Sequence, residues 1–197
     1  MSTVNLTESG RNRSALMAEV EAEGGRNIRS CYQCGKCSAG CPVLFAMDWQ
    51  PHQVMRLVHL GLKDVVLKSS SIWVCASCIT CTTRCPRRVD IAGVMEALRI
   101  MARKHGYPAR EKSIAMFHDI FLDTVRQYGR LHELGMLGKF KLATGNLFQD
   151  LGLGPRMMIQ GKLSLAPHRI AGAAAIRRIY DKIRDYEKIQ GGEGVRP

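Results

Sequence analysis

The sequence lacks a long apolar run. No window of its 197 residues approaches the about 18 consecutive apolar residues that a membrane-spanning helix requires. Residues 1–25 are polar and mixed in charge, without the apolar segment of a secretory signal peptide. We therefore expect no membrane span and a protein that works in the reducing cytoplasm.

The common motifs of enzyme active sites are also missing. The sequence contains no glycine-rich dinucleotide fingerprint, no P-loop and no paired nucleophile and base. Almost no segment alternates apolar and polar residues as a half-buried strand does. We expect an all-α protein that has no catalytic residue and no site for an organic substrate or a flavin.

Acidic residues are few. The chain has 17 Asp and Glu against 29 Lys and Arg, which gives a net charge of +12. Such an excess often indicates nucleic-acid binding. Here, however, basic and acidic residues mix along helical patterns such as "IRRIYDKIRDYEKI", which is typical of solvated helix faces. We expect no nucleic-acid binding and favour docking onto an acidic partner protein.

Cysteine is absent from most of the chain. All eight cysteines lie in two stretches, "CYQCGKCSAGCP" at 31–42 and "CASCITCTTRCP" at 75–86. A secreted disulfide scaffold would distribute its cysteines among distant loops. In each stretch, cysteines at positions i, i+3 and i+6 are followed by a fourth at i+10 and a proline. This spacing matches the bacterial cubane-cluster motif.

The motif spacing predicts how the thiolates are shared. Three thiolates on one loop can reach three irons of a cube, and in two-cluster proteins the fourth cysteine ligates the other cluster. We therefore predict two [4Fe–4S] clusters. The expected ligands of cluster 1 are Cys31, Cys34, Cys37 and Cys85. The expected ligands of cluster 2 are Cys75, Cys78, Cys81 and Cys41.

Structural zinc is the alternative, because it also binds Cys-x2-Cys pairs. Zinc needs only four ligands, usually from two separated pairs, so two complete four-cysteine runs favour clusters. Two clusters with crossed ligands must lie close together, which predicts electron transfer between them. Two clusters of charge about −2 each would also lower the net charge from +12 to about +8.

Several other polar residues are candidates for supporting roles. Four cations in or beside the motifs either raise the cluster potentials or are ordinary surface residues: Lys36, Arg84, Arg87 and Arg88. His52 and His59 lie seven residues apart on one predicted helix face. Without a third ligand, two histidines are expected to be surface or interface residues.

Composition and the spacing of apolar residues divide the chain into three regions. Residues 1–27 are expected to form an arm with a short helix around 14–23, and residues 28–108 a helical cluster domain. In that domain Pro51 suits a helix start, and Asp90 is the expected cap of another helix.

Residues 109–197 form the C-terminal region. We expect helices over 109–128 and 169–189, and an irregular glycine-rich segment over 129–168. This region is predicted to be an extension that orders against partner subunits. A small helical C-terminal domain is the alternative.

The two stretches "CYQCGKCSAGCP" and "IWVCASCITCTTRCPRRVDIAGVMEALR" resemble the C subunit of heterodisulfide reductase, over about residues 25–105. The resemblance implies an α-helical ferredoxin fold, with the family's eight cluster ligands on the eight cysteines. It also implies a relay subunit of an oxidoreductase complex. Such a subunit passes electrons between a flavin-bearing A subunit and a catalytic B subunit that reduces a disulfide. The Cys-Cys-Gly motifs of the B subunit are absent here.

Several functional alternatives remain open. The complex could bifurcate electrons at the flavin of its A subunit, and its donor could be a hydrogenase, a formate dehydrogenase or a reductase of one-carbon metabolism. The chain could instead be a free-standing ferredoxin-like carrier, or the iron–sulfur subunit of a quinone-linked membrane complex. A structural adaptor stabilised by zinc is the remaining alternative.

Overall fold

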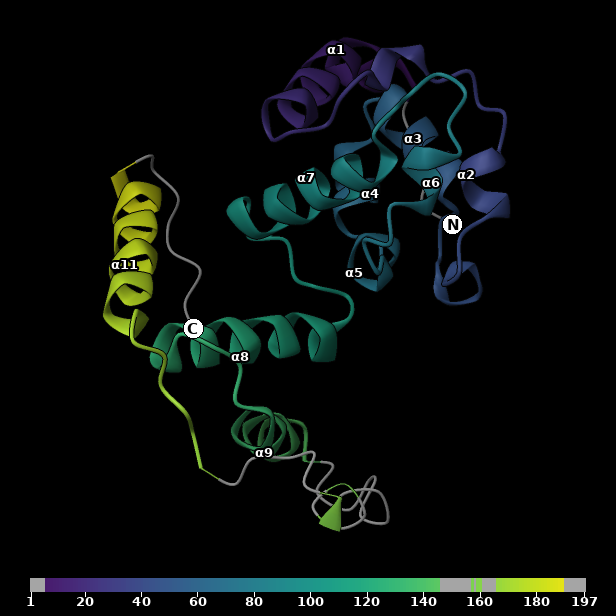
Figure 1. Cartoon of the computed structure of the whole chain (residues 1–197). Coiled ribbons are helices and arrows are strands. Elements are labelled where there is room, and N and C mark those ends of the chain that lie inside the picture. The colour runs from purple at the N-terminus through teal and green to yellow at the C-terminus, as the bar shows by residue number, and fades with distance from the viewer. Residues whose placement is uncertain (1–5, 146–156, 158, 161–165, 190–197) are drawn as a thin grey trace. The chain divides into compact units, whose positions relative to one another are not determined.

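The computed structural model describes residues 6–145, 157, 159–160 and 166–189. Every regular element in that part of the chain is a helix, which confirms the all-α prediction (Figure 1). None of the helices found there is both long and apolar enough to span a membrane. The chain divides into two compact units, residues 1–111 and 112–197, and each is described by itself below.

Unit 1 (residues 1–111) contains both cysteine motifs and consists of short helices. Its α-helices are α1 (Leu6–Ala22), α2 (Lys36–Ala39), α3 (Pro51–His59), α4 (Lys63–Leu67), α5 (Ser71–Val74), α6 (Thr80–Thr83) and α7 (Ile91–Lys104). Two 3-10 turns, η1 (Ile28–Ser30) and η2 (Leu44–Ala46), lie near the first motif. Pro51 is the first residue of α3, as predicted, because its missing N–H has no helical partner at that position.

The core of unit 1 forms where α1, α3 and α7 pack together. Twelve side chains in it are the largest that are less than 2% exposed: Leu16, Val20, Ile28, Val54, Met55, Val58, Val66, Leu67, Ile72, Val89, Met95 and Leu98. Burying a side chain of this size contributes about 1.5–3 kcal/mol. This core therefore supplies the rigid support on which the cysteine loops lie.

Two parts of unit 1 differ from the sequence-based expectations. The N-terminal helix begins at Leu6, earlier than expected, and its Leu16 and Val20 are buried in the core. His59 is 6% exposed and is therefore not a surface residue. Its Nε2 lies 2.8 Å from the carbonyl oxygen of Ile28, so Nε2–H donates to that acceptor. A buried hydrogen bond holds His59, and periodicity alone could not show this.

Asp90 caps α7 as predicted. Its carboxylate accepts a hydrogen bond from the backbone N–H of Gly93 and another from the hydroxyl of Thr82, each at 3.0 Å. The second bond ties the start of α7 to α6, which lies in the second cysteine motif. Most of the apolar residues of α7 are buried, including Val94 and Leu98. The cap thus fixes the chain where it leaves the second motif.

Asp48 organises the segment between the two motifs. Its Oδ1 accepts hydrogen bonds from the hydroxyls of Ser69 and Ser71 at 2.7 and 2.6 Å, and from the Ser71 N–H at 3.0 Å. Its Oδ2 accepts the Ser70 N–H at 3.0 Å and pairs with Arg110 at 3.1 Å. Partial burial raises the pKa of Asp48, but the hydrogen bonds from Ser71, Ser69 and these N–H groups outweigh it. They hold the pKa well below its usual range.

Asp48→Asn is expected to destabilise the protein by about 1.5–3 kcal/mol at pH 7, because an amide nitrogen would face several donors. The folded-state pKa of Asp48 lies below the unfolded value of about 3.9. The stabilisation is therefore fully present above that value and is lost only as the pH falls through the folded-state pKa. Thermal unfolding of the cluster-loaded protein should show the same penalty at pH 8 and at pH 5.

Glu19→Gln is the matched control for Asp48→Asn, because the Glu19 side chain is 44% exposed and its ion pair with Lys63 lies at the surface. It should change the free energy of unfolding by less than about 1 kcal/mol. A penalty for Asp48→Asn that shrinks between pH 8 and pH 5 would show that Asp48 titrates in the ordinary range. That outcome would contradict the network described above.

Unit 2 (residues 112–197) contains α8 (Lys112–Tyr128), α9 (Glu133–Thr144) and α11 (Ala173–Ile189). α8 packs against both of the other helices. Arg126 of α8 pairs with Asp181 of α11 at 2.6 Å, and the rings of Phe117 and Phe140 meet edge to face at 5.6 Å. The helices predicted over 109–128 and 169–189 correspond to α8 and α11, with later starts.

The prediction that residues 129–168 are irregular is wrong for α9. His132 caps this helix by accepting the N–H of Gly135 at its Nδ1, at 3.1 Å. The helix therefore forms in spite of its two glycines, Gly135 and Gly138. The rest of the predicted irregular segment lies largely outside the described residues.

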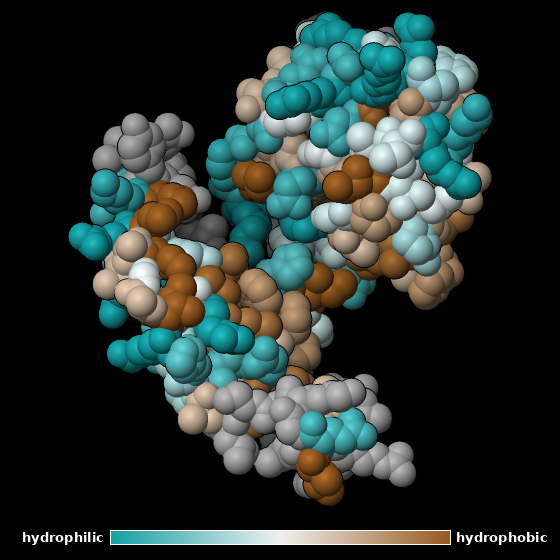
Figure 2. Space-filling model, in the orientation of Figure 1, coloured by the Kyte–Doolittle hydropathy of each residue, from teal (hydrophilic) through white to brown (hydrophobic). Residues whose placement is uncertain are grey.

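Unit 2 exposes several large apolar side chains. Among the described residues the most exposed on α9 and α11 are Leu142 at 71%, Ile179 at 56% and Ile183 at 54%. Figure 2 shows apolar surface over α8 and α11. Exposed apolar side chains that gather in a contiguous patch are typical of an interaction surface.

Candidate iron–sulfur centres

The two cysteine loops have the same backbone form. Each has two residues in the left-handed region, at matching positions on either side of its second cysteine. These are Gln33 (φ 64°) and Gly35 (φ 75°) in the first motif, and Ser77 (φ 50°) and Ile79 (φ 63°) in the second. Each loop then enters a short helix, α2 or α6, that carries the third cysteine. The repeated turns wrap each loop around a central space.

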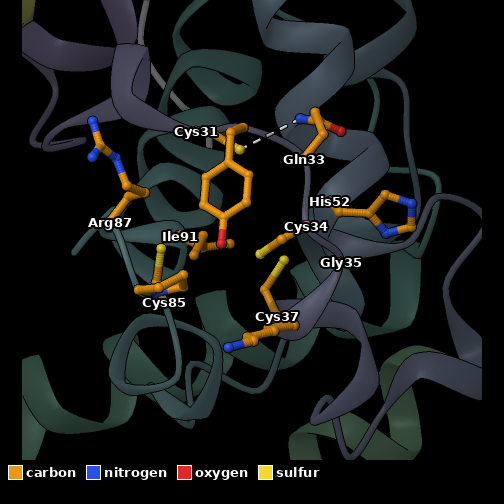
Figure 3. Close-up of a pocket in the computed structure, with 12 residues that line it drawn as sticks. Cys31, Gln33, Cys34, Gly35, Cys37, His52, Cys85, Arg87 and Ile91 are labelled. Atoms are coloured by element: carbon orange, nitrogen blue, oxygen red, sulfur yellow. Dashed lines mark hydrogen bonds between the residues drawn. The ribbon is translucent and has the colours of Figure 1, made fainter.

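The first cavity lies inside the first loop. It is lined by the sulfur-bearing residues Cys31, Cys34, Cys37 and Cys85. Figure 3 shows Cys85 facing the other three from the second motif. The cavity has about 340 Å³ of space not filled by protein atoms, part of it open to solvent.

The second cavity repeats this arrangement with the motifs exchanged. It is lined by Cys75, Cys78, Cys81 and Cys41, and it has about 350 Å³ of comparable space. The structure thus brings together the two groups of four cysteines that the sequence predicts. In the described part of the chain no three Cys, His, Asp or Glu side chains could hold a single metal ion. Each group of four stands around a cavity, and an all-thiolate donor set of this kind fits a cubane cluster.

Burial divides the cysteines into two kinds. Burial raises the pKa of Cys37 and Cys75, and it raises the pKa of Cys81 to about 11. The pKa values of the exposed thiols shift in the opposite direction. A hydrogen bond from the Lys36 backbone lowers the pKa of Cys34, and a hydrogen bond from the Thr80 side chain to the thiolate lowers that of Cys78.

This pattern locates the solvent edges of the two cavities. Cys34 and Cys78, the second cysteines of their motifs, are exposed. Cys37, a third cysteine, is 8% exposed. Each centre therefore has one edge at the surface and one edge toward the interior.

The structure separates the four candidate cations. Lys36 and Arg87 line the first cavity. The guanidinium of Arg84 lies over Gly40, where any larger side chain would collide with it. Arg88 has a left-handed backbone (φ 53°), and its carbonyl accepts a hydrogen bond from the side chain of Asn27. Neither Arg84 nor Arg88 lines either cavity.

His52 also contributes to the wall of the first cavity, although its ring points away from the sulfurs in Figure 3. The Ser38 hydroxyl oxygen accepts the backbone N–H of His52 at 3.1 Å. The same hydroxyl lies 2.7 Å from His52 Nδ1, to which it donates its proton. His52 is therefore a wall residue, held by Ser38.

Sequence reasoning missed two side chains that support the sites. Gln33 donates to the sulfur of Cys31 at 3.4 Å, shown by the dashed line in Figure 3. Arg99 is only 8% exposed and donates to the carbonyl oxygens of Ile72 and Cys75 at 2.9 and 3.1 Å. For Arg99 the available signal in the sequence was its position among the apolar residues of α7.

Comparison with known proteins identifies residues 27–89 as a 4Fe-4S dicluster domain. Over 98 residues the chain is 41% identical to the iron-sulfur C subunit of the CoB–CoM heterodisulfide reductase of Methanopyrus kandleri, covering 49% of this chain and 51% of that protein. Over 114 residues it is 32% identical to the C subunit of the H2:CoB-CoM heterodisulfide,ferredoxin reductase of Methanothermobacter thermautotrophicus, covering 57% and 62%.

A third relative is the C subunit of the ferredoxin:CoB-CoM heterodisulfide reductase of Methanosarcina acetivorans, 38% identical over 90 residues, or 46% of this chain and 35% of that protein. The matched part thus spans about half to three fifths of the first two relatives. The comparisons confirm the resemblance to the C subunit of heterodisulfide reductase. They also confirm that the cofactors of the dicluster domain are two [4Fe–4S] clusters.

Gly35→Ala is expected to destabilise the protein by about 1–2 kcal/mol, because φ at Gly35 is 75°. A Cβ there would meet nothing within 4 Å, so the backbone alone causes the loss. Gly138→Ala is the matched control, since it also has free space around its Cβ but lies in helix α9. It should stabilise by about 0.5–1 kcal/mol. Equal effects of both changes on thermal unfolding would contradict the left-handed turn.

Proposed function

We propose that this chain, with its 4Fe-4S dicluster domain, is the electron-transfer subunit of a heterodisulfide-reductase-type complex. In this role it passes electrons between a flavin-bearing A subunit and a catalytic B subunit that reduces a disulfide. The observation that carries the proposal is the pair of sulfur-lined cavities, each of which takes its fourth cysteine from the other motif. The chain is then part of an oxidoreductase while containing no catalytic residue of its own.

The ligand assignment is part of this proposal. Cluster 1 is held by Cys31, Cys34, Cys37 and Cys85. Cluster 2 is held by Cys75, Cys78, Cys81 and Cys41. The lining of the two cavities supports this division. When bound, the clusters supply one-electron chemistry at potentials that the protein tunes.

The chain's own residues position the centres and open them to partners. The exposed Cys34 and Cys78 mark an edge of each centre that another redox protein can approach. The contact between α2 and α6 holds the two motifs side by side, so an electron that arrives at one centre lies close to the other. The buried Cys37, the partly buried Cys75 and Cys81, and the core of unit 1 limit the access of water to the opposite edges.

In this proposal the C-terminal region, residues 109–197, contacts the partner subunits, and the chain's net positive charge favours the docking. The exposed apolar residues of α9 and α11 support a role of this region in subunit binding. The net charge of +12 supports acidic partners. We place the complex in the cytoplasm, with a hydrogenase, a formate dehydrogenase or a one-carbon reductase as its electron donor. Electron bifurcation at the A-subunit flavin is a further part of this proposal.

Anaerobic purification from native cells tests the function. The chain should elute with a flavin-containing protein and a second iron–sulfur protein, and it should itself hold about eight irons and eight acid-labile sulfides. A ferredoxin-like carrier would elute alone in high salt, and a quinone-linked subunit would co-purify with a membrane cytochrome. Four or fewer irons, or bound zinc, would refute the two-cluster proposal.

Cys41→Ser and Cys85→Ser are a matched pair that tests the crossed ligands. Cys41→Ser should chiefly remove the electron paramagnetic resonance signal of cluster 2, although Cys41 belongs to the first motif. Cys85→Ser should chiefly remove that of cluster 1. Cys34→Ser and Cys78→Ser, which remove the second cysteine of each motif, provide the reference spectra for loss of each centre. If Cys41→Ser matched the spectrum of Cys34→Ser instead, each motif would hold its own cluster.

A further inference from the structure

The two cavities share one backbone plan but have different walls. Besides its cysteines, the first cavity is lined by Tyr32, Gln33, Gly35, Lys36, His52, Pro86, Arg87 and Ile91. The corresponding residues of the second are Val43, Met47, Pro51, Ala76, Ile79, Ala92 and Met95. The first wall is therefore rich in polar and cationic groups, and the second is apolar throughout. Figure 3 shows Arg87 beside Cys85 at the first cavity.

The two cavities also differ in charge: cationic side chains line the first and, among the described residues, not the second. Lys36 and Arg87 line the first cavity, and neither has a carboxylate partner within the described residues. In the described part of the chain, no cation lines the second cavity. Outside its wall, Arg99 donates to the carbonyl oxygen of Cys75 and pairs with Glu96 at 3.0 Å, and Arg84 lies against Gly40, next to Cys41. Among the described residues that line the two cavities, unpaired cations therefore occur only at the first.

Hydrogen bonds to the sulfurs do not reverse this difference. The Cys31 sulfur accepts from Gln33, and the Cys85 sulfur accepts the backbone N–H of Val89, both at 3.4 Å. At the second cavity the Cys78 sulfur and the Thr80 hydroxyl lie 3.4 Å apart, and the hydroxyl donates to the sulfur once Cys78 is a thiolate ligand. The first cavity therefore has at least as many donors toward its sulfurs as the second.

We propose that cluster 1 has the higher reduction potential of the two centres. Adding one electron makes a centre more negative by one charge. Unpaired cations and polar donors stabilise that charge, whereas apolar walls penalise it. A single electron supplied by a reductant thus resides on cluster 1, and downhill transfer runs from cluster 2 to cluster 1. The inference rests on the two-cluster assignment made under the proposed function.

A redox titration of the full, iron-loaded chain tests this order. With dithionite as the one-electron donor and low ionic strength, electron paramagnetic resonance should give two midpoint potentials. Lys36→Gln and Arg87→Gln should each lower the higher potential, by about three- to tenfold in the reduction equilibrium constant, where tenfold equals 59 mV for one electron. The lower potential should move less. Because both side chains are exposed, the shift should shrink in high salt.

Three further variants serve as the controls and as the converse test. Lys68→Gln removes the same charge from an exposed position that lines neither cavity, and it should leave both potentials unchanged. Ile79→Lys adds a cation at the exposed rim of the second cavity and should raise the lower potential. Ile79→Gln, which changes shape without charge, should have a smaller effect.

The outcomes separate this inference from the proposed function. If a chain with eight irons shows a larger shift of the lower potential than of the higher one in Lys36→Gln, or no shift in Lys36→Gln or Arg87→Gln, the proposed order is wrong while the two-cluster assignment stands. Fewer than eight irons would instead overturn the assignment itself. Iron content is therefore measured on every variant, which also detects a variant that fails to fold.

Discussion

Each cavity of this protein is closed by a sulfur that comes from the other motif, and the rest of unit 1 is arranged around that exchange. For Cys41 and Cys85 to cross, the two loops must lie face to face, which is why the short helices α2 and α6 touch. The contact is tight: Arg84 of the second motif occupies the space that a side chain at Gly40 would need.

The crossing also constrains the chain between the motifs. Residues 42–74 must leave the first loop and return to the second at a fixed distance, and Asp48 secures both ends of this path. It accepts hydrogen bonds from residues 69–71, which lie at the start of α5, just before the second motif. At the far side of the second motif, the bond between Thr82 and Asp90 fixes the departure into α7. Polar networks outside the cavities therefore set the positions of the sulfurs inside them.

The parts of this arrangement that the sequence predicted are those with local signatures. Cysteine spacing predicted the two groups of four, Pro51 and Asp90 marked helix starts, and the absence of strand patterns indicated an all-α fold. The missed parts depend on contacts between distant residues. His59 looked like a surface residue because its partner is the carbonyl of Ile28, which no pattern reveals. The helix α9 was hidden by its glycines, since its cap depends on the His132 side chain.

The residues between the cysteines explain how one backbone plan can give two different centres. The cysteine ligands and the left-handed backbone turns repeat in both motifs, so a difference between the centres must come from the other side chains. Lys36 in the first motif corresponds to Thr80 in the second, and Tyr32 corresponds to Ala76. Both turn positions differ as well: Gln33 corresponds to Ser77, and Gly35 corresponds to an exposed Ile79 that keeps a left-handed backbone. An isoleucine there costs about 1–3 kcal/mol in strain, while its apolar side chain adds to the wall of the second cavity. The repeated loop places two centres that can each accept an electron. We propose that these few sequence differences between the motifs determine which centre is reduced first.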